Sequence, residues 1–344
     1  MIQHSKPNIT LKDREAVDEL LMSGNIASGK MVVAFEEAIL KFVNSSYGIF
    51  IDSGSKGIKL ALRALEITAG DEVILPTYVC HSVIDAIVSI GATPVLCDVS
   101  DNWNVSLDDV ETVMSPKTKA IILVHTMGIA LNVNAFRKFN VPLIEDCCQA
   151  LGSINKLGQM IGTAGDLSVF SFHAIKCITT GEGGFISTNN QALYDRLKAL
   201  TYAKSDRSSV SDLQAVLGLS QLNAYPKNLA IRKNIAQTYF KEIENKQLTI
   251  TFQHLFEQSN GYRFLLTSDV DFKHCRAFFE AHGVAVRKGV DELLHLNYPQ
   301  FAKSKYPFAE RIFKKTVSIP IYPSLTQENI QYVIQLINKY DAFR

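Results

Sequence analysis

The chain has 344 residues, 47% of them hydrophobic, and its 35 Lys and Arg residues nearly balance 34 Asp and Glu residues. The net charge of +1 gives no bulk electrostatic support for nucleic-acid binding, and apolar runs such as 120–124 are far shorter than the ~20 residues of a membrane span. The polar stretch 1–13 shows no signal peptide and the six cysteines have no ligand spacing, so we expect buried thiols in a cytoplasmic protein.

Short apolar runs alternate with helical patterns through the first two thirds of the chain. The expected strands are 48–51, 72–75, 94–99, 120–125 and 141–144, with helices at 56–65 and 80–89. Runs that are apolar throughout are typical of strands buried on both faces, as in a parallel sheet covered by helices. The pattern therefore predicts an α/β fold with a mostly parallel sheet.

The character of the sequence changes after residue 222. A polar amphipathic helix is expected at 227–244, followed by a strand at 262–266 and helices at 272–282 and 326–340. In a chain too long for one small core, this change predicts a large domain over 1–222 and a smaller C-terminal α+β domain over 223–344.

Lys176 occupies an unusual position for a lysine, between two apolar, strand-like runs within 167–187. Removing an isolated ammonium from water costs several kcal/mol, so such a lysine needs an anionic partner, must be neutral, or must be used covalently. Burial is expected to lower its pKa and to make the amine nucleophilic toward an aldehyde. The alternative is a lysine on a connecting loop that happens to follow a buried strand.

A small glycine-rich turn, Ser53 to Gly57, lies between an expected strand and an expected helix and contains Ser55 and Lys56. Its backbone N–H groups would lie at the positive end of the helix dipole, which is a favourable site for phosphate. The alternative is that the turn only caps the helix. A P-loop kinase or NTPase is disfavoured, because Lys56 is followed by Gly57 rather than by Ser or Thr.

Two carboxylates, Glu145 and Asp146, terminate the apolar strand 141–144. The carboxyl ends of parallel strands face the crevice where α/β sheets bind ligands, so Asp146 could hold a protonated ring nitrogen. The alternative is a carboxylate that caps the next segment. A metal site is disfavoured, because the adjacent Cys147 and Cys148 cannot easily point to one ion.

Ser171 and His173 precede Lys176 closely. The Ser171 hydroxyl could bind a phosphate while the lysine reaches the other end of the ligand, whereas a lone histidine is more often structural. The glycines within 181–184 predict a tight hairpin. Together, a phosphate cradle, a strand-end carboxylate, a second hydroxyl and a buried lysine fit a phosphorylated aromatic aldehyde with a basic ring nitrogen, namely pyridoxal 5′-phosphate.

Motifs along nearly the whole chain match those of one known family. They lie at 21–29, 52–62, 70–76, 91–95, 144–150, 162–166, 212–215 and 318–321, and the most specific are Phe170-Ser-Phe-His-Ala-Ile-Lys176 and Thr179-Thr-Gly-Glu-Gly-Gly184. With these motifs the sequence resembles the DegT/DnrJ/EryC1/StrS family of sugar aminotransferases, which are pyridoxal-phosphate enzymes of fold type I.

The resemblance implies that Lys176 bonds covalently to the cofactor, that Asp146 pairs with the pyridine nitrogen and that Gln149 approaches the ring hydroxyl. It also implies that glutamate donates the amino group, that a keto-sugar, most simply a nucleotide-linked one, accepts it, and that the protein is a homodimer with its active sites at the subunit interface.

The resemblance further implies that Ser171 and the backbone around Ser55 and Lys56 hold the cofactor phosphate. The family usually carries an Asn that reaches the phosphate of the partner subunit, and the matching position here is Arg207. A guanidinium could still bind phosphate, with a different reach.

Two more departures from the family pattern are visible. The position that often carries an aromatic residue stacked on the ring is Cys80, with Tyr78 and His81 nearby, and the connection 128–141 is shorter than usual. Lys176 favours transamination over the dehydratase branch of the family, which carries histidine in its place. The scattered cysteines give no support for an iron–sulfur cluster.

The alternative function is a non-catalytic ligand-sensing regulator on the same fold, which the intact Lys176 and Asp146 argue against.

Overall fold

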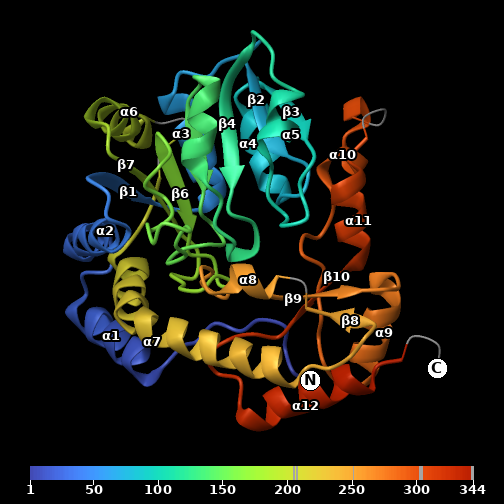
Figure 1. Cartoon of the computed structure of the whole chain (residues 1–344). Coiled ribbons are helices and arrows are strands. Elements are labelled where there is room, and N and C mark those ends of the chain that lie inside the picture. Colours follow the sequence, from blue (N-terminus) through green and yellow to red (C-terminus); the bar gives the residue numbers. More distant parts are fainter. Residues whose placement is uncertain (204–205, 207, 251, 302–304, 342–344) are drawn as a thin grey trace.

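The computed structural model describes residues 1–203, 206, 208–250, 252–301 and 305–341. Its central feature is a seven-stranded sheet with the strand order β1-β7-β6-β5-β4-β2-β3 (Figure 1). The strands are β1 (Tyr47–Ile51), β2 (Glu72–Pro76), β3 (Thr93–Cys97), β4 (Thr118–Val124), β5 (Leu143–Asp146), β6 (Leu167–Ser171) and β7 (Gly184–Thr188). Strand β7 runs antiparallel to both of its neighbours, β1 and β6, and every other pair in this sheet is parallel. The predicted α/β class with a mostly parallel sheet is confirmed.

Helices cover the large sheet, which explains why its central strands are buried. All residues of β5 and β7 are buried. The covering elements are α2 (Lys30–Val43), α3 (Gly54–Ala64), α4 (His81–Ser89), α5 (Leu107–Glu111) and α6 (Gln191–Tyr202). Helix α3 packs against β5, β6 and β7, so its N-terminus lies close to the carboxyl end of β6. Between β4 and β5 the chain forms only the 3-10 turns η1 (Thr126–Gly128) and η2 (Val133–Phe139), consistent with the short connection expected there.

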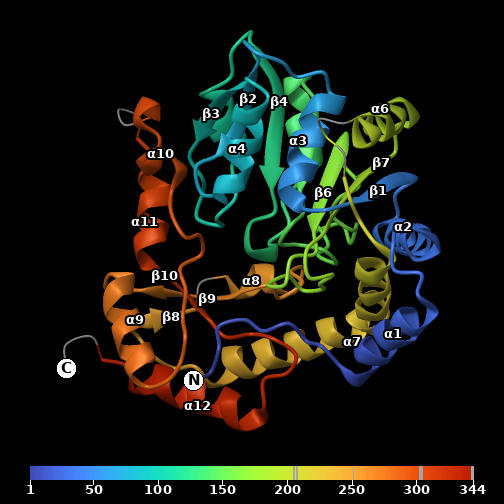
Figure 2. The same cartoon turned by 180° about the vertical axis from the view of Figure 1, so that it is seen from behind.

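A second, three-stranded antiparallel sheet has the order β10-β9-β8 (Figure 2). Its strands are β8 (Leu248–Thr249), β9 (Phe264–Ser268) and β10 (Thr316–Ile319), accompanied by α8 (Gln253–Phe256), α9 (Phe272–Ala281), α10 (Leu294–Asn297), η3 (Pro299–Phe301), α11 (Pro307–Lys315) and α12 (Gln327–Lys339). Buried side chains of both sheets belong to one hydrophobic cluster. The two sheets therefore share a core.

One long helix, α7 (Asp212–Glu242), joins the two parts of the molecule, and α1 (Leu11–Ser23) packs along it (Figure 1). The helix begins at a capping box in which the Ser211 and Gln214 side chains satisfy each other's backbone N–H groups, and it continues through Pro226. The helix expected at 227–244 is thus the second half of a longer one. The division at residue 222 remains a proposal and falls inside α7.

The N-terminal residues lie against the C-terminal part of the chain. Ile2 donates a hydrogen bond to the Gly283 carbonyl at 2.7 Å and accepts one from the Ala285 N–H at 2.9 Å.

Among the described residues, no helix combines the length and the apolar character that crossing a membrane requires.

Candidate active site

The candidate site lies at the carboxyl ends of β5 and β6. Asp146 is the last residue of β5; it is buried and pairs in register with Val124 of β4 and Val169 of β6. Its Oδ1 atom accepts a hydrogen bond from the Cys148 N–H at 3.0 Å. The carboxylate is therefore held at the edge of the sheet where a ligand was expected.

Lys176 lies in the loop that joins β6 to β7. Hydrogen bonds from the Phe172 N–H to the Gly183 carbonyl (2.8 Å) and from the Thr180 N–H to the Phe172 carbonyl (3.0 Å) close this loop. The Lys176 Nζ atom lies over the ring of Tyr262, 5.4 Å from the ring centre. The ammonium group therefore contacts an aromatic face supplied by a distant part of the sequence.

A small cavity brings three of the predicted residues together. Gln149, Ser171 and Lys176 line it, together with Cys148 and Asn260. Wider hollows elsewhere, such as one between residues 1–5 and α9, contain none of the predicted residues. Lys176 does follow a buried strand on a connecting loop, as the alternative supposed, but its side chain reaches a shared cavity.

The protonation of Lys176 differs from the expectation. Burial alone would lower the pKa of Lys176, but its electrostatic interactions with Tyr262, Cys148 and Asp146 outweigh burial and raise its pKa above the ordinary value. The predicted lowering of this pKa was wrong, because the sequence showed the burial and not the groups around the amine. The protein groups by themselves keep Lys176 charged.

The predicted phosphate cradle is the N-terminus of α3. Ser53 is the N-cap, and its Oγ atom accepts the Lys56 N–H at 3.2 Å. A Cβ atom placed on Gly54 would lie 3.0 Å from the Ser171 Cβ atom, so this helix end and Ser171 lie in contact. The Lys56 ammonium pairs with Asp52 at 3.4 Å. A phosphate here would meet the backbone around Ser55 and the Ser171 hydroxyl.

Gln149 is fixed by the loop that follows β4. Its Oε1 atom accepts the Met127 N–H at 2.8 Å, and its carbonyl accepts a hydrogen bond from the Asn260 side chain at 3.1 Å. Asn260 also donates to the Leu151 carbonyl at 3.0 Å. The amide nitrogen of Gln149 is therefore the group that remains to meet a ligand.

The candidates for ring stacking lie at the beginning of α4. Cys80 is exposed and is the N-cap of α4, and it is one of the groups around the Lys176 ammonium, so it lies near the site. Tyr78 is fully buried, and His81 contacts Asp85 at 3.3 Å.

Arg207, the remaining predicted phosphate ligand, lies outside the described residues.

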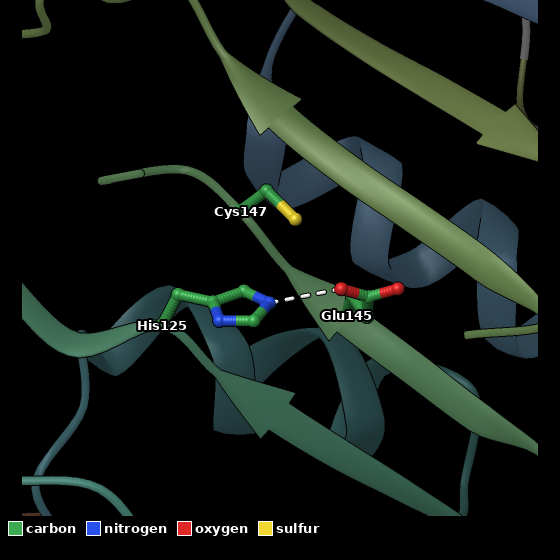
Figure 3. A group of neighbouring side chains, drawn as sticks. All are labelled: His125, Glu145 and Cys147. Atoms are coloured by element: carbon green, nitrogen blue, oxygen red, sulfur yellow. Dashed lines mark hydrogen bonds and ion pairs between the residues drawn. The ribbon is translucent and has the colours of Figure 1, made fainter. Parts of the chain in front are cut away.

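A group of three side chains at the ends of β4 and β5 had no predicted role. His125, Glu145 and Cys147 lie together, and His125 Nε2 is 2.9 Å from Glu145 Oε2 (Figure 3). Burial and the neighbouring carboxylates, Glu145 first, raise the pKa of Cys147 well above its ordinary value, so its thiol stays protonated and is a poor metal ligand. Glu145 already accepts hydrogen bonds from the Gly162, Ala164 and Gly165 N–H groups at 2.9, 2.7 and 2.5 Å. His125 and Glu145 therefore form a saturated hydrogen-bond network, and Cys147 lies beside it.

Asn260 and Tyr262, which complete the site, were not predicted. Both come from the segment before β9 and are buried, and the Tyr262 N–H donates to Asn260 Oδ1 at 2.9 Å. No spacing in the sequence connects them with Lys176, more than 80 residues earlier. Only the packing of the second sheet region against the first brings them there.

Comparisons with known proteins agree with this geometry. A sequence model of the DegT/DnrJ/EryC1/StrS aminotransferase family matches residues 7–338. Over 361 aligned residues the chain is 32% identical to the GDP-perosamine synthase of Escherichia coli O157:H7, with 97% of both chains covered.

Solved structures are similar over nearly the whole length. The aminotransferase TlmJ from Streptoalloteichus hindustanus superposes with a TM-score of 0.93 at 26% identity, covering 98% of each chain. The Spr1654 protein of Streptococcus pneumoniae, solved in PLP and PMP forms, matches in its PLP form with a TM-score of 0.87 at 26% identity, covering 97% of each chain.

Proposed function

Because the chain belongs to the DegT/DnrJ/EryC1/StrS aminotransferase family, we propose that it transfers an amino group from glutamate to a nucleotide-linked keto-sugar. It is a pyridoxal-phosphate-dependent sugar aminotransferase, and the predicted family, fold type and transaminase class are confirmed. The observation that carries the activity is the cavity in which Lys176 meets Gln149 and Ser171, beside the buried Asp146. A non-catalytic regulator would not need this set of residues.

The residues present fit pyridoxal 5′-phosphate. Gly54 at the N-terminus of α3 packs against Cys148 and Ser171, so the helix end where a phosphate would bind lies beside Ser171. Asp146 offers a buried carboxylate at the end of β5, and Lys176 offers an amine inside the cavity. When bound, the cofactor would supply an aldehyde that carries the amino group and a ring that takes up electrons.

We assign each role to residues of this chain. Asp146 would hold the ring nitrogen protonated, because a buried carboxylate favours a cationic partner. Ser171 and the backbone around Ser55 would bind the phosphate, and the Gln149 amide would approach the ring hydroxyl. Lys176 would hold the cofactor and, once released, would move a proton on its Nζ atom. The charges that raise the pKa of Lys176 keep that proton available.

The substrate class follows from the relatives. A relative at 32% identity is a GDP-perosamine synthase, which supports a nucleotide-linked keto-sugar as the amino acceptor. Glutamate as the donor is a proposal from the family resemblance. A cytoplasmic location is also proposed, and the six free cysteines agree with a reducing compartment.

We propose that the protein is a homodimer. Exposed apolar side chains gather on α1, on the segment after it and on the first turns of α2 and α7, which pack together. They are Leu11, Leu21, Met22, Ile26, Val33 and Leu213. Apolar side chains grouped in this way are typical of a surface covered by a partner. Light scattering of the purified protein is expected to give twice the chain mass, and a monomer would refute this proposal.

Labelling the cofactor lysine tests the function. Borohydride reduction of the protein loaded with pyridoxal 5′-phosphate should leave a phosphopyridoxyl mass on the peptide that contains Lys176. The Lys176→Ala variant should carry no label. A label on Lys56 instead would overturn the assignment, and no visible absorption band after loading would favour the regulator.

Substrate identity is tested separately. The loaded protein, incubated with glutamate and a panel of nucleotide-linked keto-sugars, should release more than one equivalent of 2-oxoglutarate per active site only when an acceptor sugar is converted. Turnover with simple keto acids but with none of the sugars would refute the proposed acceptor.

A further inference from the structure

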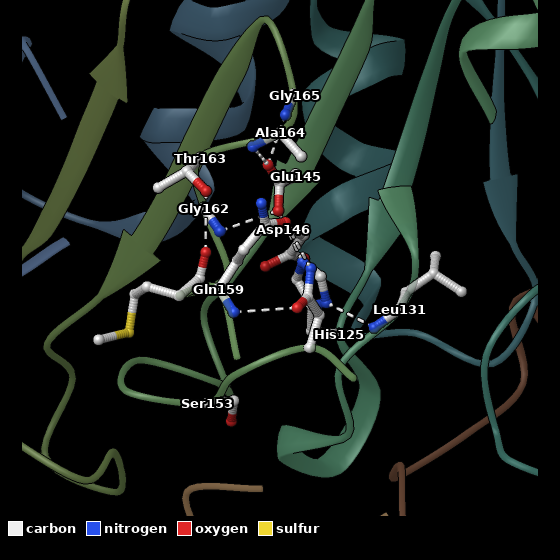
Figure 4. Close-up of polar contacts among 12 residues, drawn as sticks. His125, Leu131, Glu145, Asp146, Ser153, Gln159, Gly162, Thr163, Ala164 and Gly165 are labelled. Atoms are coloured by element: carbon white, nitrogen blue, oxygen red, sulfur yellow. Dashed lines mark hydrogen bonds and ion pairs between the residues drawn. The ribbon is translucent and has the colours of Figure 1, made fainter. Parts of the chain in front are cut away.

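A buried carboxylate that accepts four hydrogen bonds, Glu145, lies directly behind the proposed site. Glu145 precedes Asp146 on β5, and successive residues of a strand point to opposite faces of the sheet. Glu145 accepts hydrogen bonds from His125 and from the N–H groups of Gly162, Ala164 and Gly165 (Figure 4). Burial alone would raise the pKa of Glu145, but these hydrogen bonds, that of His125 first, outweigh it and lower the pKa. The carboxylate is therefore ionised and fully used inside the protein.

The bond pattern fixes the state of His125. Its Nδ1 atom accepts the Leu131 N–H at 3.0 Å, so this nitrogen carries no proton (Figure 4). The proton of the neutral ring is then on Nε2, which donates to Glu145 at 2.9 Å. The imidazole of His125 therefore links Glu145 to the backbone of Leu131, so both ends of the segment 125–131 are fixed.

The chain held in this way is strained. Met127 has a φ of 58°, and the following Gly128 has a φ of 83°. A left-handed conformation is unfavourable for a non-glycine residue, and it persists only where the surroundings impose it. The Met127 N–H points from this turn to Oε1 of Gln149, at 2.8 Å. The turn that His125 closes therefore sets the direction of the Gln149 side chain.

The second loop fastened by Glu145 covers β6. Gly162 has a φ of 87°, and a Cβ atom on it would lie 2.5 Å from Cζ of Phe170. Phe170 directly precedes Ser171, the proposed phosphate ligand. Glu145 thus holds this loop against the strand that leads to Ser171 and Lys176.

We propose that Glu145 and His125 are a positioning pair for the cofactor site: they fix Gln149 and the ends of β5 and β6 from the opposite face of the sheet. Neither side chain is among those that line the cavity. The inference rests on the proposed function, because it concerns how the site holds its cofactor. It assigns a role to two residues that touch neither cofactor nor substrate.

Substitutions of His125 separate the two bonds of its ring. His125→Leu removes both bonds. His125→Gln can still donate an amide N–H to Glu145 and so is the conservative variant. Glu145 keeps its three backbone donors in both, so both are expected to fold. Glu36→Gln, which neutralises a half-buried carboxylate that accepts the Phe50 N–H at 2.8 Å, is the matched control.

The measurements are the visible absorption and circular dichroism of the bound cofactor, the cofactor dissociation constant, kcat and KM, and the thermal midpoint. We expect His125→Leu to shift the cofactor dichroism and to lower kcat at least tenfold, with KM for glutamate changed less than threefold. His125→Gln should recover most of the spectrum and of kcat. Glu36→Gln should leave both at the wild-type level.

Two results would overturn the proposal. One is an unchanged cofactor spectrum and kcat in His125→Leu. The other is a fall in kcat that is fully explained by a smaller folded fraction of the variant, with the same fall in His125→Gln as in His125→Leu. If the wild-type protein binds no pyridoxal phosphate at all, the proposed function fails instead, which the same titration shows first.

Discussion

Replacing Tyr262 by leucine is expected to make Lys176 react faster with the cofactor aldehyde. The Lys176 Nζ atom lies 5.4 Å from the centre of the Tyr262 ring, and Arg263 lies over the same ring with its Cζ atom at 4.6 Å. The tyrosine is buried, with 6% of its surface exposed. Its loss should therefore destabilise the ammonium form.

The magnitude follows from the type of contact. A cation over an aromatic face gains about 0.5–1 kcal/mol when exposed and about 2 kcal/mol when desolvated. For the ammonium inside the cavity we take about 1–2 kcal/mol, which at ~1.4 kcal/mol per decade is a factor of about 5 to 30. Because the pKa of Lys176 is raised, the amine is mostly charged at pH 8. Lowering this pKa should increase the neutral, reactive fraction by that factor.

Stopped-flow absorbance of the cofactor-free protein mixed with pyridoxal 5′-phosphate at pH 8 measures this rate. Tyr262→Phe keeps the aromatic face and should stay within about threefold of wild type, given the size of the ring contact. Thermal denaturation is measured first, since removing a buried ring can cost a few kcal/mol of stability. An unchanged or slower rate in folded Tyr262→Leu would refute the reasoning. If Tyr262→Phe reacts as fast as Tyr262→Leu, the phenolic oxygen rather than the ring sets the protonation.

Three further predictions concern the cofactor. Asp146→Asn can keep the hydrogen bond from the Cys148 N–H but loses the charge. Turnover should fall by about 10²-fold or more while cofactor still binds, consistent with ~4 kcal/mol for a close charge pair at an effective dielectric of about 20. Near-normal turnover would assign the role to another residue. Gly54→Ala brings a methyl group to 3.0 Å from Ser171 Cβ, so a fluorescence titration should show weaker cofactor binding, and unchanged affinity would argue against the cradle. Arg207→Ala should weaken cofactor binding roughly ten- to a hundredfold if the guanidinium binds phosphate, worth about 1.5–3 kcal/mol. A constant within about threefold of wild type would remove that role.

The parts of the site that are local in the chain were predictable. The apolar run 141–144 predicted a strand covered on both faces, so its end, and with it Asp146 at the end of β5, could be located from the sequence. Ser53 caps α3 through a hydrogen bond between residues three apart, which a short motif can encode. The glycines within 181–184 correctly predicted that the chain returns antiparallel beside β6, but the connection spans 172–183 and is not the tight hairpin expected. Helices α1 and α2 were not anticipated individually, and α7 proved longer than expected, because Pro226 and a polar stretch obscured its continuity.

Tertiary structure decided the electrostatics and the support of the site. The sequence showed that Lys176 follows a buried strand, but the sign of its pKa shift depends on Tyr262 and Asp146, which only the folded chain brings to the amine. The pairing of His125 with Glu145 arises because β4 and β5 are neighbours in the sheet, which no local pattern specifies. Short-range propensity fixes helices, strands and caps, since their hydrogen bonds join nearby residues. Charge interactions act through space, so the chemistry of Lys176 was determined only when distant segments packed around it.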